Sequence, residues 1–372
     1  MKIRMIIAVA VIAVVLFYVY RTVDTIQELH SGGFLYQAPL SYELIDREGT
    51  IISGSFTYAR EFREGFAPVA RDGVYGYINT AGEIVIPFEF QEAEEFSEGL
   101  AAVNMNGKWG FINPEGQVTI APQFNYAGPF REGLAAVMVN DAYGYIDKTG
   151  QYVVKSQYDF AWPFHEGRGV VKVAKKSTLI DRNGKAIANL PYDFIRPFQE
   201  GKALVVKDGK AGYIDKDAKV VIPLSFEFAW DFSEGLAVIK QNDKYGYIDS
   251  SGKIAIAPQY SWASGFSEGL AKVVLDDKVG FINKQGQLVI AAKYRYARNF
   301  REGLAGCRID KSYGFIDKTG KVKIKLDYDW VSDFSDGVAW VVSPAEESLL
   351  DRGKYFCLSL LLYFGVSGEG RL

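Results

Sequence analysis

The hydrophobic and polar positions of this chain repeat every 34 residues, and the spacing stays constant over most of the sequence. The most regular feature is a phenylalanine, then a variable residue, then an acidic residue and a glycine. The motif begins at Phe62, Phe96, Phe130, Phe164, Phe198, Phe232, Phe266, Phe300 and Phe334. A fixed period of about 20 to 50 residues is typical of stacked or ring-shaped repeat proteins. We therefore predict a repeat architecture in which each unit contacts mainly its neighbours.

The apolar pattern inside one unit predicts three short strands. Residues 100–105 and 108–113 flank Asn106-Gly107, the dipeptide that most strongly indicates a two-residue hairpin. Residues 113–116 have the sequence of a type I turn, and a third strand follows over 117–120 until Pro122 ends it. No stretch shows a sustained helical period, and a crossover helix does not fit into the unit. The prediction is an all-β chain of short three-stranded antiparallel meanders.

The two ends of the array bear on whether it is open or closed. The first unit begins at Tyr42, one residue out of phase, and a tenth unit begins near Ser348 and breaks off. A closed propeller-like ring requires the first and last units to pair, and both look degenerate. Atypical terminal units are the usual caps of open arrays. We therefore expect an open, curved or superhelical array, with the closed ring as the alternative.

A second recurring element, Trp109-Gly110-Phe111-Ile112-Asn113 with its Tyr-Gly-Tyr-Ile-Asp variants, identifies a resemblance. From about Tyr42 to about Asp351 the chain resembles the bacterial WG-repeat proteins. The resemblance implies a β-rich repetitive fold, often with a signal or membrane anchor, and it brings no catalytic residues. We interpret the following as structural positions of the repeat: Gly99, Trp109, Gly110, Gly116, Gly133, Gly235, Gly269 and Gly303.

Residues 1–22 differ from the array and predict a signal anchor or transmembrane segment in the form of one hydrophobic helix. Lys2 and Arg4 precede an apolar run over residues 5–20, about 24 Å long as a helix. Positive charge before the run places the N-terminus inside and the array outside the cytoplasm, as a single-pass membrane protein. Secretion after signal cleavage is the alternative. Residues 23–40 then form a juxtamembrane stalk, 41–351 the array of about nine repeats, and 352–372 an atypical tail.

Charge and cysteine content exclude some functions. The formal net charge is −3 and there is no block of basic residues, so nucleic acid is not an expected partner. Of the two cysteines, Cys307 occupies a position that is valine or isoleucine in most other units, which predicts a small buried hydrophobe. Cys357 lies in the atypical tail.

The candidate chemistry is limited. Regular carboxylates such as Glu98 and Asp147 could hold Ca²⁺ between turns, but each lies beside a turn glycine, which favours a structural role in the turn. The two histidines, His30 and His165, have no partner motif, and no nucleophile triad, metal motif or phosphate loop occurs. We predict no enzyme activity, no cofactor and no metal.

Aromatic residues in the connectors are the best candidates for ligand binding. They are Tyr126, Trp162, Trp230, Trp262, Tyr296 and Trp330. Such side chains either pack between units or form a surface that binds a protein or stacks on sugar rings. We expect a non-enzymatic extracytoplasmic scaffold that binds an envelope protein or cell-wall glycan by repeated weak contacts. A structural spacer, or less favourably a hydrolase of envelope polymers, is the alternative.

Overall fold

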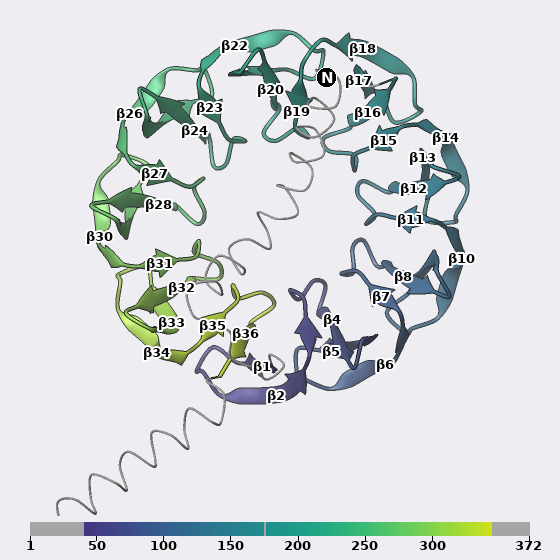
Figure 1. Cartoon of the computed structure of the whole chain (residues 1–372), viewed down its shortest axis with the longest axis horizontal. Helices are drawn as coiled ribbons and strands as arrows, with labels where there is room; N and C mark the ends of the chain where they lie inside the picture. Colours follow the sequence, from purple (N-terminus) through teal and green to yellow (C-terminus); the bar gives the residue numbers. More distant parts are fainter. Residues whose placement is uncertain (1–40, 175, 344–372) are drawn as a thin grey trace, which may run out of the picture. The chain divides into compact units, whose positions relative to one another are not determined.

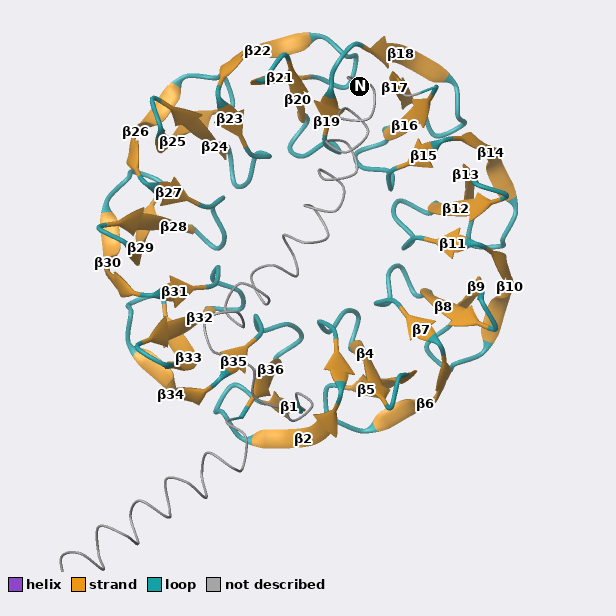
Figure 2. Cartoon of the chain, in the orientation of Figure 1, coloured by secondary structure: helices purple, strands orange, loops and turns teal. Residues whose placement is uncertain are grey.

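The computed structural model describes residues 41–174 and 176–343, and these residues form a ring of β-sheets (Figure 1). The ring contains nine four-stranded sheets, or blades, each antiparallel throughout. Only strands, turns and loops appear in the coloured part of Figure 2. In the described residues there is thus no helix long and apolar enough to cross a membrane. The predicted N-terminal helix lies outside the described residues and gains no support from the structure.

Each blade has a very short strand nearest the centre of the ring and a longer one at the rim (Figure 1). The innermost strands are β35 (Trp330–Val331), β3 (Tyr58–Ala59), β7 (Glu92–Ala93), β11 (Tyr126–Ala127), β15 (Phe160–Ala161), β19 (Phe194–Ile195), β23 (Phe228–Ala229), β27 (Trp262–Ala263) and β31 (Tyr296–Ala297). The second strands are β36 (Ala339–Val342), β4 (Phe66–Arg71), β8 (Ala101–Met105), β12 (Ala135–Val139), β16 (Gly169–Val173), β20 (Ala203–Lys207), β24 (Leu236–Gln241), β28 (Leu270–Leu275) and β32 (Leu304–Ile309).

The third and outermost strands complete each blade. The third strands are β1 (Tyr42–Ile45), β5 (Val74–Asn79), β9 (Lys108–Ile112), β13 (Ala142–Ile146), β17 (Lys176–Ile180), β21 (Lys210–Ile214), β25 (Lys244–Asp249), β29 (Lys278–Asn283) and β33 (Ser312–Asp317). The outermost strands are β2 (Ile51–Phe56), β6 (Ile84–Phe90), β10 (Val118–Phe124), β14 (Tyr152–Tyr158), β18 (Ala186–Leu190), β22 (Val220–Phe226), β26 (Ile254–Tyr260), β30 (Leu288–Tyr294) and β34 (Val322–Tyr328). Blade 1 is β3–β6, blades 2 to 8 follow in chain order, and blade 9 contains β35, β36, β1 and β2.

The predicted turns are present where the sequence places them. Asn106 and Gly107 both have positive φ, at 54° and 78°, as a primed hairpin between β8 and β9 requires. The amide of Gly116 donates to the Asn113 carbonyl at 2.9 Å, which closes the turn before β10. These local predictions are confirmed because two or three residues determine each turn.

The prediction of three strands per unit was wrong. The connector over residues 123–129 contains the end of β10 and the innermost strand β11 of the next blade. In addition, β10 does not stop at Pro122 but bulges over Gly110, where an added Cβ would lie 2.6 Å from the Ile120 carbonyl oxygen. Blade 4 has Thr178 at the equivalent position, and its outer strand β18 pairs without this bulge. The glycine is therefore required by the crossing of the outer strand.

The hydrophobic core lies between blades rather than within them. One cluster joins Phe111 and Ile120 of blade 2 to Phe130 and Val137 of blade 3, and equivalent clusters follow around the ring. Cys307 belongs to such a cluster and is fully buried, which confirms its predicted role, and burial raises its pKa to about 12. Since each core needs two blades, no blade is expected to be stable alone.

The ring is closed, and the prediction of an open array was therefore wrong. The N-terminal strand β1 pairs with the last strand β36, from Tyr42 opposite Val342 to Ile45 opposite Ala339. The two incomplete terminal units are complementary halves, because β35 and β36 supply the inner strands of blade 9 and β1 and β2 supply the outer ones. We call the contact between β1 and β36, with the adjoining packing of blade 9 on blade 1, the closure seam.

Candidate functional site

The Phe-x-Glu-Gly turns point toward the centre of the ring and connect every blade to the next. In each turn the acidic residue and the glycine have positive φ, and the acidic side chain accepts a hydrogen bond from the turn glycine of the following blade. The acceptor–donor pairs are Glu64–Gly99, Glu98–Gly133, Glu132–Gly167, Glu166–Gly201, Glu200–Gly235, Glu234–Gly269, Glu268–Gly303, Glu302–Gly337 and Asp336–Gly65. The acidic column is thus a continuous circle of carboxylate–amide bonds.

Most of these carboxylates also contact a cation from a neighbouring turn. Lys148 Nζ lies 3.3 Å from Glu98 Oε2, and Glu132, Glu166, Glu234, Glu268 and Glu302 have equivalent partners. Burial alone would raise the pKa of Glu98, but the Gly133 amide and Lys148 outweigh it, and the pKa is lowered. Among the described residues no group of three or more His, Cys, Asp or Glu is arranged to hold a metal ion. The turn role of these carboxylates, anticipated from the sequence, joins blades rather than closing a single turn.

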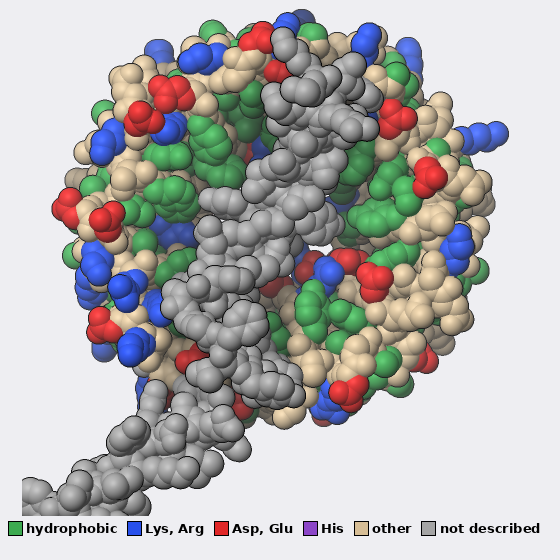
Figure 3. All heavy atoms as spheres, in the orientation of Figure 1, with side chains coloured by type: hydrophobic (Ala, Val, Ile, Leu, Met, Phe, Trp, Pro, Cys, Tyr) green, Lys and Arg blue, Asp and Glu red, His purple; other side chains and the backbone are tan. Residues whose placement is uncertain are grey.

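The predicted aromatic residues all lie on or beside innermost strands. Tyr126, Trp262, Tyr296 and Trp330 begin β11, β27, β31 and β35, while Trp162 and Trp230 follow β15 and β23 by one residue. All six are partly exposed. On the face shown in Figure 3, hydrophobic side chains gather around the central opening, over β11 to β15 and over β23 to β28. The structure therefore brings these residues to the opening, but as a circle of patches rather than one pocket.

Trp162 and Trp230 are held in the same way in blades 4 and 6. The hydroxyl of Tyr145 donates to the Trp162 carbonyl at 2.6 Å, and Tyr213 does the same for Trp230 at 2.5 Å. The indole of Trp162 lies edge-on to Phe160, with centroids 4.4 Å apart. These contacts fix both indoles at low entropic cost to a ligand, which is the property of an aromatic anchor at a binding surface.

Each tryptophan in this region also carries a cation. Lys172 Nζ is 5.5 Å from the ring centroid of Trp162, Arg196 Cζ is 5.5 Å from that of Trp230, and Lys272 Nζ is 5.5 Å from that of Trp262. These distances are within the range of cation–π attraction.

The other two predicted positions are partly packed between blades. Tyr126 lies between the rings of Trp109 and Tyr143, at 6.4 and 6.0 Å. Tyr296 lies 6.1 Å from Tyr313. The remaining residue, Trp330, contacts the Tyr42 ring at 5.8 Å across blade 9. Their role in binding stays a prediction.

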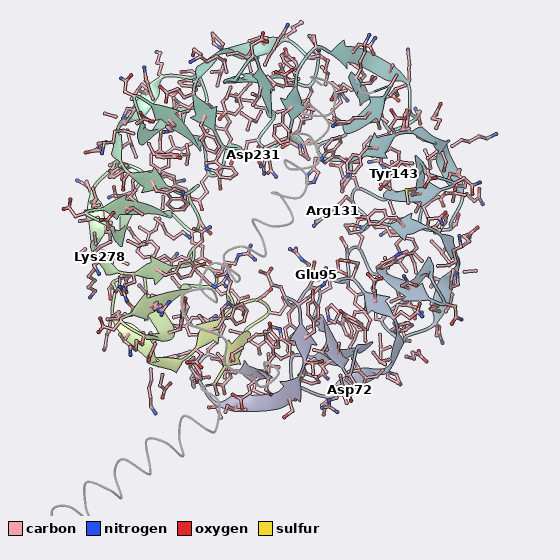
Figure 4. The ribbon with its side chains drawn as sticks, in the orientation of Figure 1. Asp72, Glu95, Arg131, Tyr143, Asp231 and Lys278 are labelled. Atoms are coloured by element: carbon pink, nitrogen blue, oxygen red, sulfur yellow. The ribbon has the colours of Figure 1, made fainter. Side chains whose placement is uncertain are left out.

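Charged side chains alternate with the aromatic patches near the opening. Arg196 Nε lies 2.7 Å from Asp231 Oδ2, while Asp231 Oδ1 is buried and has no hydrogen-bond partner in the described residues. Burial raises the pKa of Asp231 and Arg196 opposes this rise. Asp333 has the same character, with a pKa raised by burial against the opposing charges of Arg298 and Arg301. Figure 4 shows Glu95, Arg131 and Asp231 near the opening and Asp72 and Lys278 at the rim.

Sequence reasoning missed three polar residues near the opening. Arg131, His165 and Gln199 occupy the variable position of the Phe-x-Glu-Gly turn in three consecutive blades. Only His165 was considered, as a solvated turn residue. The signal in the sequence was the type of residue at this position, which is serine in four of the other turns.

This arrangement of nine blades around an opening, with no helix and no metal-binding cluster in its described part, defines a β-propeller. Propellers of repeated units are typically non-catalytic binding scaffolds. The chain belongs to the family of the WG containing repeat, which matches it nine times, over residues 44–75, 75–109, 109–141, 143–176, 178–210, 212–245, 245–278, 280–311 and 313–342.

Solved structures share the fold at low sequence identity. A eukaryotic initiation factor matches with a TM-score of 0.55 and 12% identity, over 83% of this chain and 100% of that chain. BamB from Moraxella catarrhalis matches with a TM-score of 0.40 and 12% identity, over 77% and 91% of the two chains. The C-terminal WD40 domain of Sif2 matches with a TM-score of 0.37 and 10% identity, over 67% and 93%. The comparison with curated proteins gave no match.

Proposed function

We propose that this chain is a non-enzymatic scaffold that binds an envelope protein through the aromatic side chains around its central opening. The observation that carries the proposal is the set of partly exposed tryptophans, each fixed by backbone or ring contacts and each paired with a cation. Aromatic residues and arginine are the side chains that most often dominate binding energy at protein interfaces. Their spacing by the repeat allows several weak contacts to act together.

A protein partner is favoured over a cell-wall glycan. Sugar rings stack on an open aromatic face, whereas Trp162, Trp230 and Trp262 each have a cation near the ring. A cation beside an aromatic anchor instead suits a partner that offers apolar side chains together with carboxylates. Glycan binding is therefore the outcome that the experiment below must distinguish.

We also propose that the propeller works outside the cytoplasm, attached to the membrane through residues 1–22 or secreted after their cleavage. The support is the sequence alone, in which Lys2 and Arg4 precede an apolar run. Fractionation of cells, with protease added outside the cytoplasmic membrane, tests this. Protection of the propeller in intact cells would contradict it.

The binding proposal is tested with the full chain and a triple variant, Trp162→Ala, Trp230→Ala and Trp262→Ala. Tyr152→Ala is the matched control, because Tyr152 is an exposed aromatic residue on the outermost strand β14. Both proteins are incubated with solubilised envelope proteins and with purified cell wall. We expect the control to retain one envelope protein that the triple variant loses. Equal retention by both would refute the aromatic site, and retention of neither material by the wild type would favour a spacer.

A further inference from the structure

The variable side chain of the Phe-x-Glu-Gly turn has an internal partner in six of the nine blades. Four of these residues are serines whose hydroxyls donate to the Phe carbonyl of the next turn at 2.7–2.8 Å: Ser97, Ser233, Ser267 and Ser335. The other two are arginines, each of which meets a carboxylate two positions earlier in the motif of the next blade. Arg63 Nε lies 3.5 Å from Glu95, and Arg301 Nε lies 3.7 Å from Asp333.

The three consecutive turns of blades 3 to 5 break this rule. Arg131, His165 and Gln199 form no side-chain hydrogen bond or ion pair with any residue that the structure describes. The position that supplies the carboxylate to Arg63 and Arg301 is Pro163 for Arg131 and Pro197 for His165. For Gln199 it is Asp231, which is bonded to Arg196 instead. One sector of the opening therefore presents hydrogen-bond donors without their acids.

The charges that face this sector have partners of their own. The pKa of His165 is lowered by its burial and by the positive charge of Arg131, with Glu132, Glu166 and Asp231 acting in the opposite direction. Glu132 accepts from Gly167 and pairs with Arg182, and Glu166 accepts from Gly201 and pairs with Lys216. The Arg131 guanidinium, which Figure 4 places beside the opening, has no such compensation.

We propose that Arg131, His165 and Gln199 bind a carboxylate group from an acidic segment of the protein partner. The proposal rests on the function proposed above, since it names the chemistry that the partner presents next to Trp162 and Trp230. The ring itself provides the reference, because arginine at this turn position is paired with a carboxylate in blades 1 and 8. A partner carboxylate would complete in blade 3 the pair that Pro163 leaves incomplete.

The test uses the purified full chain and a fluorescently labelled, capped hexaglutamate peptide, with hexaglutamine as the uncharged probe. Two variants remove the site in different ways. Arg131→Gln removes the cation, and Pro163→Glu supplies the internal acid that Glu95 supplies to Arg63. Glutamate is already present at this repeat position in Glu61 and Glu95, so the second variant is compatible with the fold. Arg301→Gln is the matched control, at an equivalent turn whose arginine is internally paired.

We expect hexaglutamate to bind the wild type and the Arg301→Gln control, and to bind both site variants about 10- to 100-fold more weakly. Equal binding by wild type and both site variants would overturn the proposal, as would equal binding of hexaglutamine or no binding of hexaglutamate. Displacement by millimolar inorganic phosphate, with no response to acetate, would overturn the assignment to a carboxylate. The Trp variants of the previous test are read separately, so an aromatic site without an acidic-segment site gives a distinct result.

Discussion

Replacement of Trp340 by alanine should open the closure seam. This residue lies on β36, is 2% exposed, and its indole Nε1 donates to the Arg60 carbonyl of blade 1 at 2.7 Å. Its ring stacks on Phe62 with centroids 5.9 Å apart and meets Phe56 edge-on at 5.8 Å. Removing a buried Trp side chain costs about 3–5 kcal/mol, and leaving the Arg60 carbonyl without its donor adds about 1 kcal/mol.

The equivalent position in blade 6 provides the control. Val238 is fully buried in the same part of the repeat, between blades that the chain connects directly. Val238→Ala deletes two methyl groups, which we expect to cost about 2 kcal/mol. Trp340→Phe retains an aromatic ring but loses the hydrogen bond to Arg60, so its effect should lie between the two alanine variants.

Urea unfolding followed by circular dichroism measures these differences. Seam opening before general unfolding should also lower the apparent slope of the Trp340→Ala transition, because surface is exposed in two steps. If Trp340→Ala destabilises the protein by no more than Val238→Ala, the seam is not the weakest interface and the reasoning is refuted.

Three further predictions concern the repeat and its turns. Gly144→Ala should destabilise the protein by about 1–3 kcal/mol, since the new Cβ would lie 2.6 Å from the Val154 carbonyl oxygen, whereas Thr178→Ala in unbulged blade 4 should cost less; denaturation midpoints compare them. The lowered pKa of Glu98 means that its stabilising effect is present above the unfolded value of 4.5 and is lost as pH falls through the folded value, so Glu98→Gln should flatten the acid side of a plot of thermal midpoint against pH. Hexaglutamate affinity should rise as pH falls toward and below 6.5, because His165 gains a proton that the peptide stabilises; an unchanged pH profile in His165→Gln would contradict this.

Local features of the fold could be read from the sequence, and the closure could not. The hairpin at Asn106-Gly107 depends on two residues that tolerate positive φ, so it was predictable. The innermost strands have only two residues, such as Tyr126–Ala127, which is too short for a periodic pattern to be recognised. The degenerate ends suggested caps because each lacks half a unit, and only their pairing shows that the halves are complementary.

The candidate site was predicted in part for the same reason. The aromatic column was visible because its members recur at one repeat position, and the structure places Trp162 and Trp230 near the opening. The donors of the Arg131 sector were not visible, because their significance depends on what the next blade lacks, as with Pro163. Interactions between blades connect residues 30 or more positions apart, and a single-unit analysis does not detect them.

The register of β1 on β36 has a mechanical consequence. Tyr42 is paired with Val342, so the described chain enters and leaves the ring at neighbouring points, and the side chains of Glu43 and Ser343 are hydrogen-bonded there. A force that pulls residues 41 and 343 apart would act across the ladder at one end, and its pairs would break one after another rather than together. The other eight blades, each a continuous stretch of chain, would carry no load until that ladder had peeled apart. The propeller would therefore yield under tension by unzipping at a single place.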